Sequence, residues 1–418
     1  MAERSVDVLL VGGGVASTTC ATELRERGFE GSILMVGREL DAPYDRTQCS
    51  KGYLRGRADR DGIALREAGW WDEHGVELLT RTSVMKLDTA AKVARLSTKD
   101  EVTYGQALVA TGANVRRLNV DGAQLDGIHY LRAPGNADAI HADAEGAARA
   151  VVVGGSYLGT ELAAALVEMG VEVTVLMQEG VALERHYGAT AGGWFQRVLE
   201  ERGVRFVGAD ALGSFKAGGA GEDRVGAVVT EGGQRLEGDL VVVAAGAVPD
   251  VMLARQSGLE LGELGGVRCD AGLRVAGAEG LFAAGDVCEW DSPLHGGPAR
   301  VEHWEVAAAQ GRTAARNMLG DGAAHDEVPY FWSDLSDWAS SEYVGVVGDG
   351  GWDAEVVRGS LEQGRFSIWY LAGGRVVGAL AVGRSEDLDH ARGLIAARTA
   401  VTGDELGDEA ADLSSLVS

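Results

Sequence analysis

The chain has 418 residues, of which 46% are hydrophobic and 24% are charged, and this length allows two or three domains of ordinary size. Its 63 acidic and 38 basic residues give a net charge of −25, which repels a phosphate backbone and argues against general nucleic-acid binding. The same charge repels an acidic protein partner at long range, so such a partner would need a local basic patch.

The N-terminal segment predicts a folded first strand rather than a signal peptide. The apolar run of residues 6–11 leads straight into three glycines, and no small-residue cleavage pattern follows it. No segment approaches the roughly 18 unbroken apolar residues that a membrane helix needs. We therefore expect a soluble protein that has no membrane partner.

The four cysteines favour a reducing cytoplasm. Cys20, Cys49, Cys269 and Cys288 are far apart, and none forms a C-x-x-C or C-x-x-x-x-C pair of the kind that carries dithiol chemistry or holds zinc. We therefore expect small buried thiols and no metal site.

An apolar run, a glycine-rich turn and an alanine-rich helix occur twice, at residues 6–28 and 149–170, and a second strand follows each copy at residues 32–36 and 172–177. In a dinucleotide-binding βαβ unit the first glycine makes the turn, the second admits the pyrophosphate and the third lets the helix pack on the strand. The pyrophosphate then rests on the helix N-terminus. Two nucleotide sites are therefore predicted, with these positions filled by Gly12, Gly14 and Ser17 in the first copy and by Gly154, Ser156 and Gly159 in the second.

An acidic residue follows the second strand of each copy, where a carboxylate accepts hydrogen bonds from ribose hydroxyls. It is Glu39 in the first copy and Glu179 in the second. A carboxylate at Glu179 repels a 2′-phosphate, and the neighbouring Met177 and Gln178 offer no cation. NADH is therefore favoured over NADPH, although Arg185 is close enough in sequence to leave the strictness of this preference open.

Six further segments follow in chain order: DAPYDRTQCSKGYLRG at 41–56, LVATGA at 108–113, VVVAAGAVPD at 241–250, LFAAGDV at 281–287, VEHWEVAAAQGRTAARNMLG at 301–320 and PYFWSDLSDW at 329–338. With the two repeats they resemble the FAD-dependent pyridine nucleotide reductases of the ferredoxin reductase type. This group includes putidaredoxin reductase, dioxygenase ferredoxin reductases and apoptosis-inducing factor. The resemblance covers nearly the whole chain, and the order of the motifs is more specific than any one motif.

The resemblance implies an α/β fold with two Rossmann-like dinucleotide-binding domains, as in glutathione reductase, and a C-terminal α+β interface domain. The expected FAD-binding domain is discontinuous and comprises residues 1–115 and 245–325. The expected NAD-binding domain spans 116–244, and the interface domain spans 326–418.

The resemblance also implies roles for an Arg, a Lys and a Glu. Arg46 would lie near the FAD phosphates or adenosine, and Lys51 near the flavin N5, where a cation stabilises the negative charge of a reduced flavin. Glu161 would pair with Lys51 at the point of hydride transfer. The chain departs from the family at Thr47, Gln48 and Cys49, where prolines and a leucine are usual, and this puts the shape of the loop at the flavin face in question.

Other residues are implied as cofactor contacts. Asp286 would accept a hydrogen bond from a ribityl hydroxyl, and the helix that starts after His303 would point its N-terminus at the flavin pyrimidine. The alternative for His303 is a structural histidine, and the alternative for Trp332, the candidate aromatic on the acceptor side, is a core position. The remaining candidate contacts are Ala110, Thr111, Gly112, Gly246, Gly285 and Trp304.

The C-terminal region reads as short strands at residues 342–348, 355–360, 365–371 and 375–383, followed by a helix at 387–400. The acidic tail of residues 403–412 holds few apolar residues, so we expect it to be mobile. Residues 335 and 336 are Leu and Ser, where many ferredoxin reductases carry Gln and Tyr. This difference slightly favours a resemblance to the apoptosis-inducing-factor side of the group.

The implied activity is that of an NADH:ferredoxin oxidoreductase. Hydride would pass from NADH to FAD, and electrons would leave singly to a small [2Fe-2S] ferredoxin of a P450 or dioxygenase system. The acceptor is implied by the resemblance and by no residue of the chain, and the acidic balance argues against an acidic ferredoxin. A monomer or a homodimer is expected.

Two other functions stay open. Cys49, two residues before Lys51, could be the single redox cysteine of an NADH peroxidase or disulfide reductase, although the flanking PYDR and SK match the ferredoxin reductase pattern. Alternatively, the FWSDL segment favours an NADH-sensing interaction protein of the apoptosis-inducing-factor kind, for which gel filtration with and without NADH would show a large shift.

Overall fold

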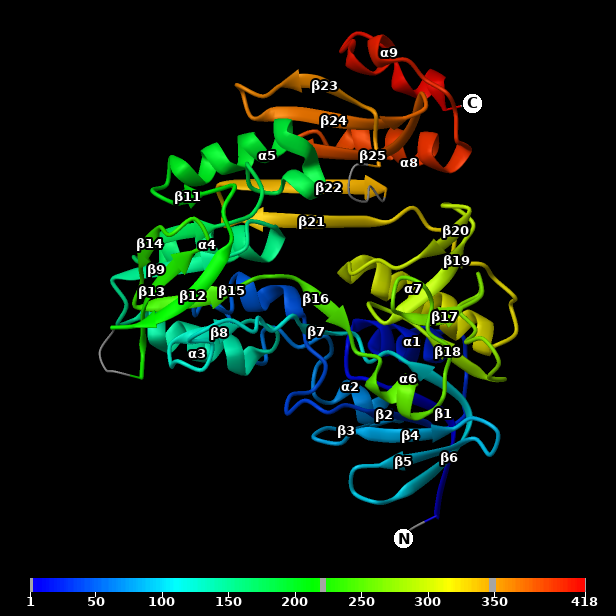
Figure 1. Ribbon diagram of the computed structural model, residues 1–418. Coiled ribbons are helices and arrows are strands. Elements are labelled where there is room, and N and C mark those ends of the chain that lie inside the picture. The colour runs from blue at the N-terminus through cyan, green and yellow to red at the C-terminus, as the bar shows by residue number, and fades with distance from the viewer. Residues whose placement is uncertain (1–2, 219–222, 346–350, 418) are drawn as a thin grey trace. The chain divides into compact units, whose positions relative to one another are not determined.

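The computed structural model describes residues 3–218, 223–345 and 351–417, and the chain divides into two compact units (Figure 1). Unit 1 comprises Met1–Asp45, Arg60–Asn114 and Ala247–Glu327. Unit 2 comprises Arg46–Asp59, Val115–Gly246 and Val328–Ser418. The chain therefore passes between the units several times, and both units are assembled from segments that are distant in sequence.

Unit 1 is built on a sheet whose parallel strands lie in the order β3-β2-β1-β6, with β18 parallel to the end of β6 and with β5 and β4 added antiparallel. The strands are β1 (Glu3–Val11), β2 (Ile33–Val36), β3 (Val76–Leu79), β4 (Val84–Asp88), β5 (Val93–Leu96), β6 (Glu101–Val109) and β18 (Leu281–Ala283). The apolar residues of β1, β2, β6 and β18 are almost fully buried, as parallel strands covered on both faces should be.

Helices α1 (Val15–Glu26) and α7 (Trp304–Met318) pack against each other on this sheet. The approach is close enough to require glycine at position 311, where a Cβ would lie 2.3 Å from the carbonyl oxygen of Ala16. Smaller elements complete the unit: α2 (Trp70–Glu73), β16 (Ala247–Pro249), α6 (Met252–Gln256) and a sheet of β17 (Val267–Cys269), β19 (Cys288–Ser292) and β20 (Gly297–Ala299). Strand β7 (Ala113–Val115) lies where the chain leaves the unit.

Unit 2 contains the second parallel sheet, in the order β11-β10-β9-β15-β8. The strands are β8 (Ile128–Tyr130), β9 (Arg149–Val153), β10 (Glu172–Leu176), β11 (Arg205–Val207) and β15 (Leu240–Val243), and the helices are α3 (Pro134–Ala144), α4 (Tyr157–Glu168) and α5 (Glu184–Glu200). An antiparallel sheet of β12 (Leu212–Ala217), β13 (Val225–Thr230) and β14 (Arg235–Glu237) accompanies it, as does the 3-10 helix η1 (Arg46–Ser50). The two parallel sheets confirm the prediction of two dinucleotide-binding folds.

The C-terminal part of unit 2 is an antiparallel sheet in the order β21-β22-β25-β24-β23. Its strands are β21 (Tyr330–Leu335), β22 (Ala339–Gly345), β23 (Ala354–Ser360), β24 (Arg365–Ala372) and β25 (Arg375–Val382), followed by α8 (Ser385–Ala397), α9 (Gly403–Gly407) and η2 (Leu413–Leu416). The predicted strand at 342–348 forms as part of β22, and its residues 346–348 lie outside the described residues.

The two units differ from the predicted three-domain division in two respects. The segment Arg46–Asp59, which the prediction gave to the FAD-binding domain, groups with unit 2, and so does the C-terminal sheet. The three domain boundaries remain a prediction. Among the helices of the described ranges, none has both the length and the apolar composition needed to cross a bilayer.

The acidic segment 403–412 differs from the expectation of a mobile tail. Arg358 on β23 is 5% exposed, and its guanidinium donates to the backbone carbonyls of Leu406, Asp408, Glu409 and Ala411. A buried arginine with five donors can therefore hold a segment that has few apolar residues of its own.

We expect Arg358→Ala to lower the free energy of unfolding by about 3 kcal/mol, because it removes the donors to four backbone carbonyls and an ion-pair partner from the buried Asp387. Urea denaturation followed by tryptophan fluorescence measures the loss. The control is Arg365→Ala, which removes an exposed ion pair with Glu386 and should cost less than about 1 kcal/mol. Equal losses in the two variants would contradict the anchoring role.

Candidate functional site

The first glycine turn, in unit 1, requires glycine where the prediction placed it. Gly12 has a φ of +120°, and a Cβ there would lie 2.0 Å from the carbonyl oxygen of Ala110. Gly14 precedes α1, and a Cβ there would meet no heavy atom within 4 Å among the described residues. The backbone at Gly14 therefore borders open space. The first turn of α1 contains no acidic residue, so its N–H groups suit a pyrophosphate.

Two buried polar atoms in the same unit support a bound polar ligand. Ser17 is fully buried, and within the described ranges its Oγ has no hydrogen-bond partner. Gln310 on α7 is also fully buried: its Oε1 accepts from the backbone N–H of Gly285 at 2.7 Å, whereas its Nε2 lacks a partner in the same part of the chain. Buried polar groups are normally paired, so both atoms fit a site for FAD.

The strand ends expected to contact FAD meet at Asp250 within unit 1. The hydroxyl of Thr111 donates to the Asp250 carbonyl at 2.7 Å, and the Asp250 N–H donates to the carbonyl of Gly112 at 2.8 Å. Arg38 pairs with the Asp250 carboxylate at 2.6 Å. Glu39 follows β2 and accepts from the hydroxyl of Tyr44.

The segment around α7 contributes the other candidates in this unit. His303 is the residue before the first helical turn and Trp304 begins it. Trp304 lines a pocket of about 380 Å³ together with α1 residues such as Val15. Gly285 adopts a φ of +78° next to Asp286, whose carbonyl accepts from Arg300 at 3.2 Å.

The second glycine turn, in unit 2, follows the same rules. Gly154 has a φ of +118°, and a Cβ there would lie 2.3 Å from the Ala244 carbonyl oxygen. A Cβ at Gly159 would lie 1.9 Å from the carbonyl oxygen of Gly154, so the helix can pack on the turn only with glycine at this position. Ser156 precedes α4 with an ordinary φ of −88°, and the first helical turn has no acidic residue. These residues fit the pyrophosphate of NADH.

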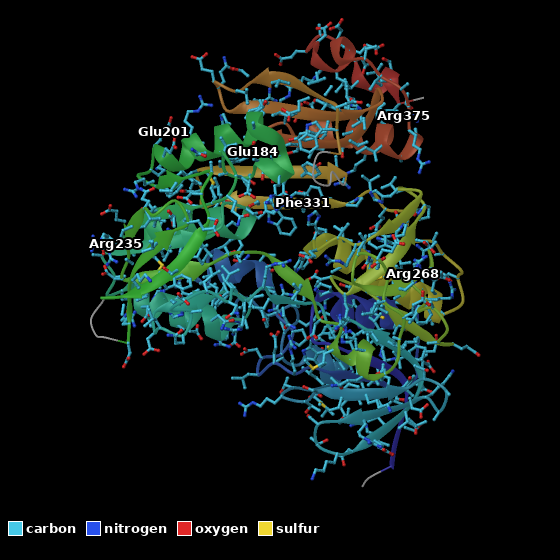
Figure 2. All side chains as sticks on the ribbon, viewed as in Figure 1. Glu184, Glu201, Arg235, Arg268, Phe331 and Arg375 are labelled. Atoms are coloured by element: carbon cyan, nitrogen blue, oxygen red, sulfur yellow. The ribbon has the colours of Figure 1, made fainter. Side chains whose placement is uncertain are left out.

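Glu179, the acidic residue after β10, lies in a loop whose backbone is hydrogen-bonded to the side chain of Glu184. The carboxylate of Glu184, which Figure 2 labels on α5, accepts from the backbone N–H groups of Gly180 at 2.9 Å and Val181 at 3.2 Å. Arg185, the cation whose role was open, forms an ion pair with Glu179 at 2.6 Å. Its positive charge is therefore committed to Glu179. Gly246, on the return strand end, has a φ of +89°, and its carbonyl accepts from the N–H of Arg116.

The structure brings Lys51 and Glu161 together in unit 2. Their Nζ and Oε1 atoms are 2.7 Å apart, and the two side chains are 12% and 9% exposed. The hydroxyls of Ser50 and Ser333 also donate to this carboxylate, at 2.5 Å and 2.7 Å. Sequence reasoning missed both serines, although each stands in a motif that it had singled out, beside Lys51 and in FWSDL. Gln310 was missed as well, and its only signal is a polar residue in an alanine-rich helix.

The remaining candidates of unit 2 lie near this pair in sequence or on β21. Arg46 begins η1 and donates to the backbone carbonyl of Arg132. Cys49, in the same 3-10 helix, is 2% exposed. Trp332 is half-buried on β21 and stacks on Tyr330 with ring centroids 6.3 Å apart, whereas Phe331, labelled in Figure 2, is buried.

Comparison with known proteins shows two family matches. The family "Pyridine nucleotide-disulphide oxidoreductase" matches residues 6–311, and "Reductase C-terminal" matches residues 330–417. The anthranilate 1,2-dioxygenase system ferredoxin–NAD(+) reductase component of Burkholderia cepacia is 34% identical over 98% of both chains.

Two solved structures extend the likeness to the whole fold. The ferredoxin reductase for the CYP199A2 system of Rhodopseudomonas palustris is 29% identical with a TM-score of 0.93, and covers 99% of this chain and 100% of its own. The reductase in the covalent putidaredoxin reductase–putidaredoxin complex is 30% identical with a TM-score of 0.91, over 99% and 98% of the two chains. These likenesses confirm the predicted fold class.

The Glu179–Arg185 pair generates a prediction about coenzyme choice. We expect Glu179→Ala to lower kcat/KM for NADH about tenfold, because a charged acceptor for ribose hydroxyls is lost. It should raise kcat/KM for NADPH about tenfold, because repulsion of the 2′-phosphate ends and Arg185 is released to bind it.

Steady-state kinetics with both coenzymes measures this switch. The control is the double variant Glu179→Ala/Arg185→Ala. In this variant the gain in kcat/KM for NADPH should disappear, whereas the loss in kcat/KM for NADH should remain. An undiminished gain in the double variant would show that Arg185 has no part in it.

Proposed function

The chain belongs to the pyridine nucleotide-disulphide oxidoreductase family, and from this premise we propose that it is an FAD-dependent NADH:ferredoxin oxidoreductase. Electrons pass from NADH through FAD to a small electron-carrier protein, which we propose is a [2Fe-2S] ferredoxin of a P450 or dioxygenase system. The names of the similar reductases, which refer to ferredoxin, CYP199A2 and putidaredoxin, support this partner class.

The observation that carries the proposal is the buried Lys51–Glu161 pair in a unit that also contains the second glycine turn. FAD, when bound, takes two electrons from NADH as a hydride and can release them one at a time. The chain's own part is to bind and orient the reactants. The N-terminus of α1 suits the FAD pyrophosphate, and the N-terminus of α4 suits that of NADH.

We propose that Lys51 supplies a fixed positive charge beside the flavin. An ammonium held in a poorly hydrated place stabilises developing negative charge more than a mobile one in water does, because it needs no reorganisation when the charge appears. Glu161 holds this ammonium in place by a direct ion pair. No side chain has to take up a proton in this step, so rate acceleration comes mainly from proximity and orientation.

We further propose a reducing cytoplasmic location and a monomeric or homodimeric state. The four cysteines are buried and form no disulfide within the part of the chain that the structure describes, which suits a compartment that keeps thiols reduced. The net charge of −25 implies that a ferredoxin with acidic character must approach a local basic area.

We expect the purified protein to be yellow and to bleach when NADH is added without oxygen. Addition of oxidised ferredoxin should then restore the flavin absorbance on the time scale that a stopped-flow instrument resolves, whereas quinones and peroxides should act much more slowly. A colourless protein, or a bound flavin that NADH does not bleach, would refute the proposal. Restoration by peroxide alone would place the chain with the NADH peroxidases.

A second measurement tests the redox role considered for Cys49. A reactive cysteine is normally accessible and has a stabilised thiolate, whereas Cys49 is almost completely buried. We therefore expect Cys49→Ser to keep NADH-dependent ferredoxin reduction within about twofold of the wild type, a difference below about 0.5 kcal/mol in barrier height. Loss of turnover together with unchanged FAD content would instead favour the peroxidase or disulfide reductase function.

A further inference from the structure

The Glu161 carboxylate is held by three side chains from two other segments: Ser50 and Lys51 are adjacent in sequence, and Ser333 is distant from both. Its Oε1 faces the ammonium of Lys51 and the hydroxyl of Ser333, each at 2.7 Å, and its Oε2 accepts from the hydroxyl of Ser50 at 2.5 Å. Glu161 lies on α4, Ser333 on β21 and Ser50 in η1. Both oxygens are therefore occupied, and the carboxylate cannot turn without breaking a hydrogen bond.

The two serines are not equivalent donors. A hydroxyl has one proton to donate, and the Ser50 hydroxyl lies near the carbonyl of Thr47 at 3.2 Å as well as near Glu161. Ser333 is 5% exposed and directs its hydroxyl at Glu161. The same oxygen of Glu161 binds Ser333 and Lys51, so Ser333 fixes the atom on which the position of the ammonium depends.

We infer that Ser333 is a positioning residue for the NADH-dependent step. It holds the Glu161 carboxylate in one orientation, and the carboxylate in turn holds the Lys51 ammonium at one place. The region of the "Reductase C-terminal" match, to which β21 belongs, thus takes part in the reductive half of the reaction. This inference rests on the proposed function, because the role of Lys51 beside the flavin does.

Neutral hydroxyl donors suit this task better than a second cation. A hydrogen bond from a hydroxyl to a carboxylate is short and directional, and it adds no charge that would compete with Lys51. A buried ion pair gains little net stability from its own attraction, so its retention fits a positional role.

The first test is made on the apoprotein and needs no flavin. Brief treatment with acetic anhydride, followed by mass spectrometry of the peptide that contains Lys51, measures how fast the amine is acylated. We expect Lys51 to be acylated severalfold faster in Ser333→Ala than in the wild type, because the loosened carboxylate lets the amine leave the pair. Ser333→Thr, which keeps a hydroxyl, should return the rate towards the wild-type value.

The second test uses the FAD-loaded protein in an anaerobic stopped-flow experiment. We expect Ser333→Ala to lower the limiting rate of flavin reduction by NADH about tenfold, as the loss of one charged hydrogen bond allows, with little change in the NADH concentration at half-saturation. In a Glu161→Gln background the same substitution should cause no further loss, because its route of action is already gone.

Ser367→Ala is the matched control. Ser367 is also fully buried in the C-terminal sheet, and its hydroxyl donates to a buried carboxylate, Asp387, at 2.6 Å. This variant should leave both the acylation of Lys51 and the rate of flavin reduction within about twofold of the wild type, a barrier change below about 0.5 kcal/mol. Equal losses in Ser333→Ala and Ser367→Ala would overturn the inference and leave Ser333 a purely structural role.

A folding defect in Ser333→Ala and a failure of the proposed function have different consequences for the inference. If Ser333→Ala does not fold, Ser333→Cys, which is close in size and a weaker donor, is measured in the same way, and wild-type values in both tests would overturn the inference. If the wild type itself is not bleached by NADH, the proposed function has failed. A difference in Lys51 acylation would then still show that Ser333 positions the pair.

Discussion

The burial of the Glu161 carboxylate in unit 2 sets a condition on which the candidate site depends. Glu161 sits on a helix between two parallel strands and is 8% exposed, so its charge must be balanced by a cation and its oxygens must be occupied by donors. Lys51 and the two serines meet these needs from segments on either side of α4 in sequence. The contacts of Ser50 and Lys51 with Glu161 lie within unit 2, with which residues 46–59 group, although βαβ topology would assign them to the first nucleotide fold.

The glycine turns impose a second condition, which is purely steric, and it explains why the sequence predicted the turns well. At Gly12, Gly154 and Gly159 a Cβ would overlap a carbonyl oxygen, so a pattern read from the sequence alone already fixes the local backbone. The two departures from the glycine pattern are tolerated for different reasons. Ser17 turns its side chain into a fully buried place that suits a polar ligand, whereas Ser156 has a φ that any residue adopts.

The serine partners of Glu161 and the anchoring of the acidic tail, which the sequence did not predict, are made by distant segments. The partners Ser50 and Glu161 are 111 residues apart and Ser333 and Glu161 are 172 residues apart, and no local pattern ties a serine to a carboxylate over such a separation. The acidic tail was misjudged for the same reason, since its order depends on Arg358, about 50 residues before it. Local signals predicted strands, turns and the two folds, but the polar partners of a buried charge depend on tertiary packing.

The aromatic side chains next to the pair explain why its partners are neutral. Tyr187 is fully buried, and its ring stacks with the rings of Tyr343 and Phe331. Its hydroxyl is hydrogen-bonded to the hydroxyl of Ser341, which lies within hydrogen-bond distance of the backbone carbonyl of Ser333. Burial raises the pKa of the Tyr187 phenol well above its usual range, and the negative charge of Glu161 raises it further. The phenols therefore stay neutral, and Lys51 is the cation that pairs with the carboxylate among the described residues. A second cation at position 333 would give the region a net positive charge that the neutral aromatic side chains could not compensate. Hydroxyl donors instead leave the charge of the Lys51–Glu161 pair balanced while they fix its geometry.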